Sequence, residues 1–275
     1  MTKGYYTSLP DRSIVAVTGS DAVAFLQGLV TQDVAALKDG QLSYGALLTP
    51  QGKIAFDFFI TVEGDSVFLE CEKNKAQALC ERLKTFILRR NITINIIEKH
   101  VVAIWNSEIA LKAFQNRRDP RHPALGYRIY VDETPDLSVE YGLEEKEPEF
   151  YYKLCTENGV PNGSRDIAFG QDGIADVNFD RFGGVSWTKG CYMGQEVTAR
   201  MHHRGLGKKG LYAVRVRGEA LPPFTDIIVD EHLIGEMRSS AGGVGLAILR
   251  HDSLPLAAKA GLVTKEWEDS LVNKA

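Results

Sequence analysis

One cysteine lies in an unusually polar stretch of the sequence. The segment TKGCYMGQEVTAR, residues 188–200, holds Cys191 between Gly190 and Gly194, with Lys189 just before Gly190. A nearby lysine favours the thiolate form of cysteine, and flanking glycines let the backbone approach a ligand closely. The residues therefore point to a nucleophile, a metal or cluster ligand, or a redox sensor. Ordinary packing stays open as an alternative, because most single cysteines are inert.

The neighbouring residues narrow these chemistries. The segment GCYMG is not the strand–nucleophile–helix turn of a hydrolase. His202 and His203 follow Cys191, but a closed zinc site needs four ligands and no second pair is evident, so the sequence disfavours zinc. A redox sensor is a weaker possibility, because a resolving cysteine is absent from the short-range sequence. The other three cysteines are far along the chain: Cys71, Cys80 and Cys155.

The glycines that follow this segment do not predict a phosphate site. The stretch RGLGKKG, residues 204–210, lacks the GKS/T order of a P-loop. It contains the spacing G-x-G-x-x-G, but no strand precedes it and no helix follows. We therefore interpret it as a linker.

Basic side chains near Cys191 favour a ligand with carboxylate groups over a phosphate ester. Arginine binds a carboxylate through two parallel hydrogen bonds, and Lys189, Arg200 and Arg204 are candidates for such pairing. Asn178, in the segment ADVNFD, offers an amide donor and an acceptor that could read the edge of a heterocycle. A turn-capping role for Asn178 is equally compatible with the sequence.

The charge is distributed unevenly along the 275 residues. The net charge is −4, which gives no general reason to expect nucleic acid or an anionic membrane as partner. Residues 132–149 are strongly acidic, whereas residues 181–210 carry six lysines and arginines against the single acid Glu196. Such a basic patch can hold an anionic ligand, although a solvated basic face is the simpler interpretation.

The compartment is predicted from cysteine usage and from the N-terminal residues. Four cysteines without a CxxC pair are typical of a reduced, intracellular protein. The N-terminal segment shows neither a signal-peptide pattern nor an Arg-rich transit segment, so we expect a bacterial cytoplasmic location. No run of 18 apolar residues predicts a membrane span.

Strands and helices are predicted to alternate irregularly, with hairpins between them. We expect a strand, turn and helix over 12–34, a β-meander over 44–71, an amphipathic helix over 73–90 and two strands over 92–105, then a short helix over 107–115, a strand over 127–131 and a helix over 147–160. This order predicts an α+β fold. From Lys208 onward, closely spaced short strands predict a small β-barrel or sandwich. The predicted domains are therefore 1–205 and 206–275.

The segment KGCYMGQE, residues 189–196, resembles the signature octapeptide of the YgfZ/Iba57 folate-binding proteins. These proteins are relatives of the glycine-cleavage T-protein, an aminomethyltransferase. Three further segments resemble elements of the same family: DPRHPALGYR (119–128), NGVPNGSRDI (158–167) and GVGLAILR (243–250). The N-terminal segments VTGSDAVAFLQGLVTQDV and YGALLTPQGKIAFDFFI resemble the opening of a T-protein, so the resemblance covers essentially the whole chain.

The resemblance implies a T-protein-like fold, with two α+β lobes of mixed or antiparallel sheets and a C-terminal β-barrel around a central channel. It implies tetrahydrofolate, or a folate derivative, as ligand and a role in assembly or repair of iron–sulfur clusters in a subset of enzymes. The family's functional cysteine corresponds to Cys191, with Lys189 as its companion. The expected folate-binding residues are those of the signature loop and nearby: Gly190, Tyr192, Gly194, Gln195, Glu196, Arg200 and Asn178.

One thiol suits a transient iron–sulfur contact better than a permanent cluster, so we expect no stable metal on this chain. The expected partners are the iron–sulfur assembly machinery and client enzymes, bound transiently, with no membrane and no direct nucleic acid.

A folate-dependent aminomethyltransferase is the alternative function, and one departure from the T-protein pattern opposes it. T-proteins carry an aspartate early in the helix after the third strand, and the matching position near Gln77 has no acid. The T-protein acidic pair at the GY strand corresponds here to Tyr127 and Arg128. Without the aspartate, aminomethyl transfer loses its main electrostatic device.

Overall fold

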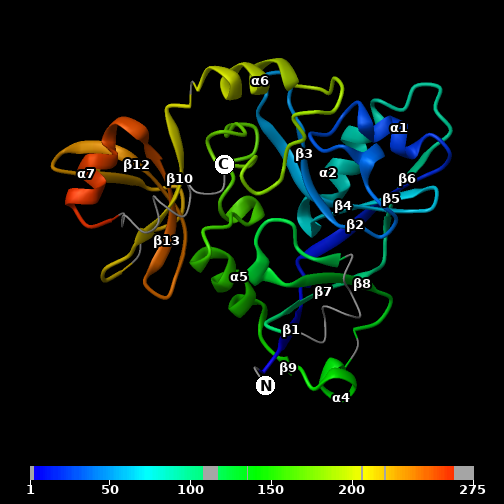
Figure 1. Cartoon of the computed structure of the whole chain (residues 1–275), viewed down its shortest axis with the longest axis horizontal. Coiled ribbons are helices and arrows are strands. Elements are labelled where there is room, and N and C mark those ends of the chain that lie inside the picture. Colours follow the sequence, from blue (N-terminus) through cyan, green and yellow to red (C-terminus); the bar gives the residue numbers. More distant parts are fainter. Residues whose placement is uncertain (1–2, 108–116, 135, 206, 220, 263–275) are drawn as a thin grey trace.

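A computed structural model describes residues 3–107, 117–134, 136–205, 207–219 and 221–262 of the chain. Its elements form two α+β lobes and a separate C-terminal sheet (Figure 1). The predicted helix over 107–115 falls almost wholly outside the described residues.

The first lobe is built on a mixed sheet of order β8-β7-β1-β9, in which β9 pairs parallel with β1 and the other pairs are antiparallel. Two helices belong to the same part of the chain, and α5 lies between this lobe and the C-terminal sheet (Figure 1). The elements are β1 (Tyr5–Ser8), β7 (His100–Trp105), β8 (Tyr127–Val131), β9 (Glu144–Glu145), α4 (Leu137–Tyr141) and α5 (Pro148–Glu157).

The second lobe is an antiparallel five-stranded sheet of order β3-β4-β5-β2-β6. Strand β2 lies between β5 and β6 in this sheet and is buried along nearly its whole length, because both faces of the sheet are covered. Val15 and Val17 pack with the helices of this lobe, whereas Ile14 points into the core shared with the other lobe. The elements are β2 (Arg12–Thr18), β3 (Ser43–Leu48), β4 (Ile54–Glu63), β5 (Ser66–Glu72), β6 (Thr93–Ile97), α1 (Ala22–Gln27) and α2 (Lys73–Lys84).

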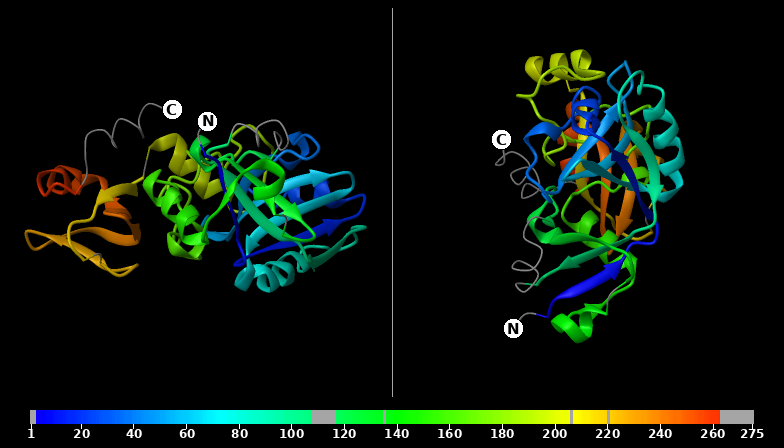
Figure 2. Two further views of the ribbon diagram at one scale, coloured as in Figure 1. Left: turned by 90° about the horizontal axis from the view of Figure 1, so that it is seen from below. Right: turned by 90° about the vertical axis from the view of Figure 1, so that its right-hand side faces the viewer.

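The C-terminal part is a four-stranded antiparallel sheet of order β10-β13-β12-β11. Figure 2 shows it standing beside the two lobes, with the α6 helix joining them. Leu211, Leu246 and Ile248 of this sheet belong to the same core as Tyr151 of α5. The elements are α6 (Gln195–Arg204), β10 (Lys209–Arg215), β11 (Asp226–Val229), β12 (His232–Ala241), β13 (Val244–Arg250) and α7 (Leu254–Lys259).

A buried ion network joins the two lobes. Glu70 of β5 is fully buried and accepts a hydrogen bond from Arg12 Nε of the adjacent strand (2.8 Å) and one from Arg128 Nε of β8 (3.0 Å). Arg128 Nη2 forms a second, shorter ion pair with the same carboxylate. Burial alone would raise the pKa of Glu70, but the two guanidinium groups outweigh it and hold that pKa at about 2.

The segment 119–128 supplies the rest of this network. Asp119 accepts from Arg121 Nε (3.0 Å) and Nη2 (2.8 Å), and it accepts a third bond from the Tyr151 hydroxyl (3.1 Å). The guanidinium groups of Arg121 and Arg128 both lie over the Phe59 ring of β4, at 4.6 and 4.2 Å from its centroid. The segment that resembles the family's DPR element therefore serves to hold the lobes together.

We expect the Glu70→Gln substitution to destabilise the protein by about 3–5 kcal/mol, because it leaves buried arginine charges uncompensated. Since the pKa of Glu70 lies below its ordinary value of 4.5, at about 2, its stabilising contribution is complete above pH 4.5 and is lost as the pH falls toward 2. Urea unfolding across this pH range measures both effects.

The exposed Glu98→Gln variant is the matched control, because Glu98 lies on the surface. Equal free energies of unfolding for the two variants at neutral pH would contradict the structural role of Glu70.

Candidate functional site

The segment that precedes Cys191 is tied to the second lobe by a series of hydrogen bonds. The Thr31 hydroxyl donates to the Gly184 carbonyl (2.6 Å), and the Ser186 N–H donates to the Thr31 carbonyl (2.9 Å). Lys189 Nζ then donates to the carbonyls of Val30 (2.8 Å) and Gln32 (2.6 Å). These contacts hold the loop that presents the thiol.

Lys189 is therefore an anchor of this loop. Its side chain is buried, and burial lowers the pKa of its ammonium to about 8. Both carbonyl partners belong to the second lobe, so the hydrogen bonds of the ammonium attach the loop to that lobe. Sequence reasoning had assigned this lysine to activation of the Cys191 thiol, and the structure gives it a different set of partners.

Tyr192 also stabilises this loop. Its ring is buried, and the ring centroid lies 5.3 Å from Lys189 Nζ. The backbone N–H of Tyr192 donates to Gln195 Oε1 at 3.4 Å. Burial raises the pKa of the Tyr192 hydroxyl to about 12. Among the described residues this hydroxyl has no hydrogen-bond partner. Gln195 and Tyr192 thus close the turn that leads into α6.

Gly194 directly precedes α6 and has a backbone conformation that other residues rarely adopt. Its φ is +79°, and a Cβ atom at this position would lie 2.6 Å from the Thr49 carbonyl oxygen. Gly190 differs, because a Cβ there would meet nothing within 4 Å. Of the two glycines near Cys191, Gly194 is the one that the local geometry requires.

Cys191 is exposed, whereas Cys71, Cys80 and Cys155 are buried. The outer face of α6 that follows is polar and open to solvent. It presents Glu196, Arg200, His203 and Arg204, all of them exposed. Neither Arg200 nor Arg204 forms an ion pair within the described part of the chain.

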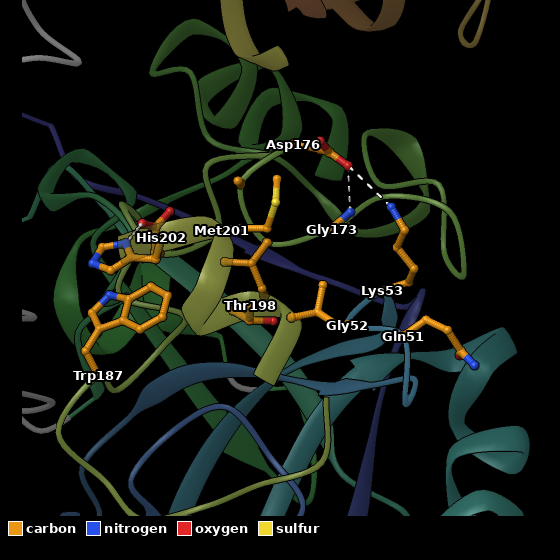
Figure 3. Close-up of a pocket in the computed structure, with 13 residues that line it drawn as sticks. Gln51, Gly52, Lys53, Gly173, Asp176, Trp187, Thr198, Met201 and His202 are labelled. Carbon is orange, nitrogen blue, oxygen red and sulfur yellow. Dashed lines mark hydrogen bonds and ion pairs between the residues drawn. The ribbon is translucent and has the colours of Figure 1, made fainter. Parts of the chain in front are cut away.

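The inner face of α6 closes a cavity of about 170 Å³ against the second lobe. Figure 3 shows Thr198, Met201 and His202 of the helix opposite the β3–β4 turn and the segment that contains Asp176. The lining residues come from four places: Gln51, Gly52 and Lys53; Gly173, Ile174, Ala175, Asp176 and Asp180; Trp187; and Val197, Thr198, Met201 and His202.

The cavity combines an aromatic wall with three charged side chains. Trp187 and His202 stack with ring centroids 3.8 Å apart (Figure 3). Lys53 Nζ lies 3.8 Å from Asp176 Oδ2, which also accepts from the Gly173 N–H at 2.9 Å. Asp180 Oδ2 lies 3.7 Å from His202 Nδ1. Its lining would suit a flat ring that carries hydrogen-bond donors.

This lining fits the ring end of tetrahydrofolate but not the whole molecule. Sites that enclose a drug-sized ligand have volumes of about 300–1,000 Å³. The tail of a folate would therefore lie outside the cavity. No group of three or more His, Cys, Asp or Glu side chains converges as a metal site in the described residues.

Asn178 follows the cavity-lining residues 173–176 in sequence and hydrogen-bonds to the C-terminal sheet. It is buried at φ +51°, and its Nδ2 donates to the Leu211 carbonyl of β10 at 2.6 Å. The residue thus ties the turn at 175–178 to the C-terminal sheet. Its amide nitrogen already donates to the Leu211 carbonyl. Recognition of a heterocycle by Asn178 therefore stays a prediction.

Sequence reasoning missed the residues that face the cavity. Lys53, Asp180, Trp187 and Met201 were not among the candidates. Trp187 and Met201 lie close to the signature octapeptide in sequence, which was the one available signal. Lys53 comes from a distant hairpin, and only the fold brings it near α6.

Comparison with known proteins places the chain in a family. It is 31% identical to the mouse "Iron-sulfur cluster assembly factor IBA57, mitochondrial", over 96% of this chain and 81% of that protein. It is 30% identical to the human protein of the same name, over 92% and 80% of the two chains. The chain belongs to the IBA57 family of iron–sulfur cluster assembly factors.

Two domain families match parts of this IBA57-family chain. The GCVT N-terminal domain matches residues 12–105, and the CAF17 C-terminal beta-barrel domain matches residues 208–269. A crystal structure of the glycine cleavage system aminomethyltransferase T from Bartonella henselae has a TM-score of 0.75 at 17% identity, covering 90% of this chain and 79% of that one. The predicted T-protein-like α+β fold with a C-terminal β-barrel-type domain is confirmed.

The predicted bacterial cytoplasmic location is wrong by the same comparison. The matched IBA57 relatives, including that of Pyricularia oryzae at 28% identity, are named mitochondrial. The expectation relied on cysteine usage and on the N-terminal residues, and the location named for these relatives overturns it. Within the described residues, no helix has the length and apolar character needed to cross a membrane.

Thiol labelling tests the exposure of Cys191. We expect one of the four cysteines to react rapidly with Ellman's reagent in the native protein, because the other three are buried, and all four to react in denaturant. The Cys191→Ala variant should lose the rapid phase. Rapid reaction of a second thiol in native buffer would contradict the burial of Cys71, Cys80 or Cys155.

A pair of glycine variants tests the start of α6. The Gly194→Ala variant should lose about 1–3 kcal/mol of stability, because alanine is strained at this φ and its Cβ meets the Thr49 carbonyl. The matched Gly190→Ala variant should unfold like the wild type, since its Cβ meets open space. Thermal unfolding compares the two, and an equal loss in both would refute the geometric distinction.

Proposed function

We propose that this chain acts in iron–sulfur cluster assembly through the thiol of Cys191. The observation that carries the proposal is the exposure of this one cysteine on a loop held by Lys189, while the other cysteines are buried. Thiolate is a soft ligand that suits iron–sulfur species. A single exposed thiol favours a transient contact, because stable clusters are usually held by four cysteines. Membership of the IBA57 family supports the same role.

The surface around Cys191 suits a protein partner. Arg200 and Arg204 project from the outer face of α6, and Trp187 keeps 36% of its surface exposed nearby in sequence. Tryptophan and arginine are common at the centres of protein interfaces, and unpaired cations accelerate association with an acidic surface. The partners we propose are the iron–sulfur assembly machinery and client iron–sulfur enzymes, bound transiently.

Tetrahydrofolate is the small-molecule ligand that we propose for the same protein. The T-protein-like fold supports it, and so does the mixed lining of the cavity behind α6. The same fold also favours the aminomethyltransferase alternative, which the missing T-protein aspartate opposes. Gln77, near which we match the T-protein aspartate, is exposed on α2, and its amide donates to Glu81 at 2.8 Å.

Replacing Cys191 with alanine in the native host tests the proposal. We expect the activity of host iron–sulfur enzymes to fall several-fold, because the only exposed thiol among the described residues is gone. Tetrahydrofolate binding to the purified variant should persist, since Cys191 does not line the cavity.

The neighbouring Thr188→Ala variant is the matched control, because Thr188 is exposed on the same loop. Full activity of the host iron–sulfur enzymes with Cys191→Ala would refute the role of the thiol. Formation of methylene-tetrahydrofolate from tetrahydrofolate and an aminomethyl-lipoyl carrier would support the transferase instead.

A further inference from the structure

Leu88, in the loop between α2 and β6, is the most exposed large apolar side chain among the described residues. It keeps 91% of its surface exposed, and its φ of +49° lies in the left-handed region that bulky residues rarely adopt. The position is therefore unfavourable both for the backbone and for the hydration of the side chain. Burial within the described part of the chain offsets neither cost, which favours a contact with another molecule.

Four cations lie close to Leu88 in sequence, and no acid occurs between residues 82 and 97. All four are exposed, and none forms an ion pair with the residues that the structure describes. Two of them lie over the rings of Phe86 and Phe25, at 4.8 and 5.8 Å from the centroids, and keep their charge. On a chain of net charge −4 these residues form a local basic surface around Leu88. Its cations are Arg82, Lys84, Arg89 and Arg90.

A second surface of this chain has the opposite charge and the second most exposed large apolar side chain of the described residues. Val139, on α4, keeps 84% of its surface exposed. Residues 132–149 around it hold eight acids against Lys146 alone. Three of these acids pair with cations: Asp132, Glu144 and Glu149. The others form no ion pair with described residues: Glu133, Asp136, Glu140, Glu145 and Glu147.

The acidic side chains gather around α4 in space as well as in sequence. Helix α4 packs beside β9, and carboxylates from both elements lie near the Tyr6 hydroxyl. Burial raises the pKa of Tyr6, and the negative charges of Glu145 and Asp136 raise it further. Asp136 also accepts a hydrogen bond from the Ser138 N–H at 3.0 Å, which caps the helix that presents Val139.

We propose that the basic surface around Leu88 docks on the acidic surface around Val139 of a second copy of this chain. Opposite charges orient the two copies before contact, and each surface then removes an exposed apolar side chain from water. The two surfaces of one copy lie apart, since α4 belongs to the first lobe and the Leu88 loop lies next to α1 in the second (Figure 1). The contact therefore joins unlike surfaces, so it closes into a ring or continues into a chain of copies.

This contact leaves the Cys191 loop free. Strand β6, which follows the Leu88 loop, is at the opposite edge of the five-stranded sheet from β3. The cavity that α6 closes lies at the β3–β4 turn instead, and neither docking surface includes a residue of α6. The association between copies goes beyond the proposed function and does not depend on it. Because each surface centres on one apolar side chain, the association is weak and reversible.

Sedimentation equilibrium of the full chain tests the contact, in reducing buffer so that Cys191 cannot form a disulfide between copies. We expect the weight-average mass to rise with protein concentration at about 0.05 M salt. The association constant should fall at least about tenfold by about 0.5 M salt, because salt screens exposed charges. A mass that stays that of one chain up to about 0.5 mM protein at low salt would overturn the proposal.

Two charge-reversed variants test the pairing of these particular surfaces. Lys84→Glu/Arg89→Glu reverses two exposed cations, and Glu133→Lys/Glu140→Lys reverses two exposed acids. Each variant alone should lose its association, because the reversed side chains then face like charges. An equimolar mixture should recover it, because the reversed side chains of one variant face those of the other. A mixture that stays monomeric would refute the pairing.

The Leu88→Asn variant separates a docking role from a structural one. Asparagine tolerates a left-handed φ better than leucine does, so the variant should unfold at the same or a higher temperature than the wild type. Loss of the apolar side chain should weaken association at least about tenfold. Wild-type association of the folded variant would overturn the role of Leu88.

The Arg217→Glu/Lys259→Glu variant is the matched control. It changes the net charge as much as Lys84→Glu/Arg89→Glu does, at exposed positions of the C-terminal part, and it should associate like the wild type. An equal loss in both variants would show that net charge alone controls association, which would overturn the proposal. A monomeric chain that binds vesicles of phosphatidylcholine and phosphatidylglycerol through Leu88 would overturn it in favour of a lipid surface.

Discussion

The arrangement of this molecule depends on one buried carboxylate that neutralises arginines from two different sheets. Glu70 lies on β5 of the second lobe, Arg12 on the neighbouring strand and Arg128 on β8 of the first lobe. Buried charges are tolerated only when they are paired, so the two sheets cannot separate without exposing an uncompensated ion. Arg128 also donates to the Tyr151 hydroxyl of α5, at 3.2 Å, and α5 packs in turn on the C-terminal sheet.

The two joined lobes support α6, a helix that is mostly exposed or half-buried. In α6, Thr198 is the one buried residue among the ten. The helix is placed at its start by Gly194 and by the loop that Lys189 anchors to the second lobe. The loop before this helix can present the exposed Cys191 thiol to a large partner, while the inner side of the helix closes a cavity. The same arrangement explains the unusually polar sequence of this segment.

Much of this could be predicted from local sequence. Periodicity and turn residues placed most strands and helices, and the octapeptide predicted the family and the fold. The roles of individual side chains were less accessible. Lys189 stands two residues from Cys191, which favours an electrostatic effect on the thiol, yet its ammonium bonds to carbonyls about 160 residues earlier in the chain. Asn178 likewise has its partner on β10.

The sequence by itself determined which short-range features exist: a thiol among polar residues, a glycine before a helix, basic residues on that helix, and an Asp-Pro-Arg element with a later arginine. These are properties of neighbouring residues, so they can be read from order alone. Only the tertiary structure decided what those residues touch. Glu70 meets Arg128 and Lys53 approaches α6 because strand pairing and burial bring distant segments together. Hydrogen bonds and ion pairs act over a few ångströms of space, whatever the separation along the chain.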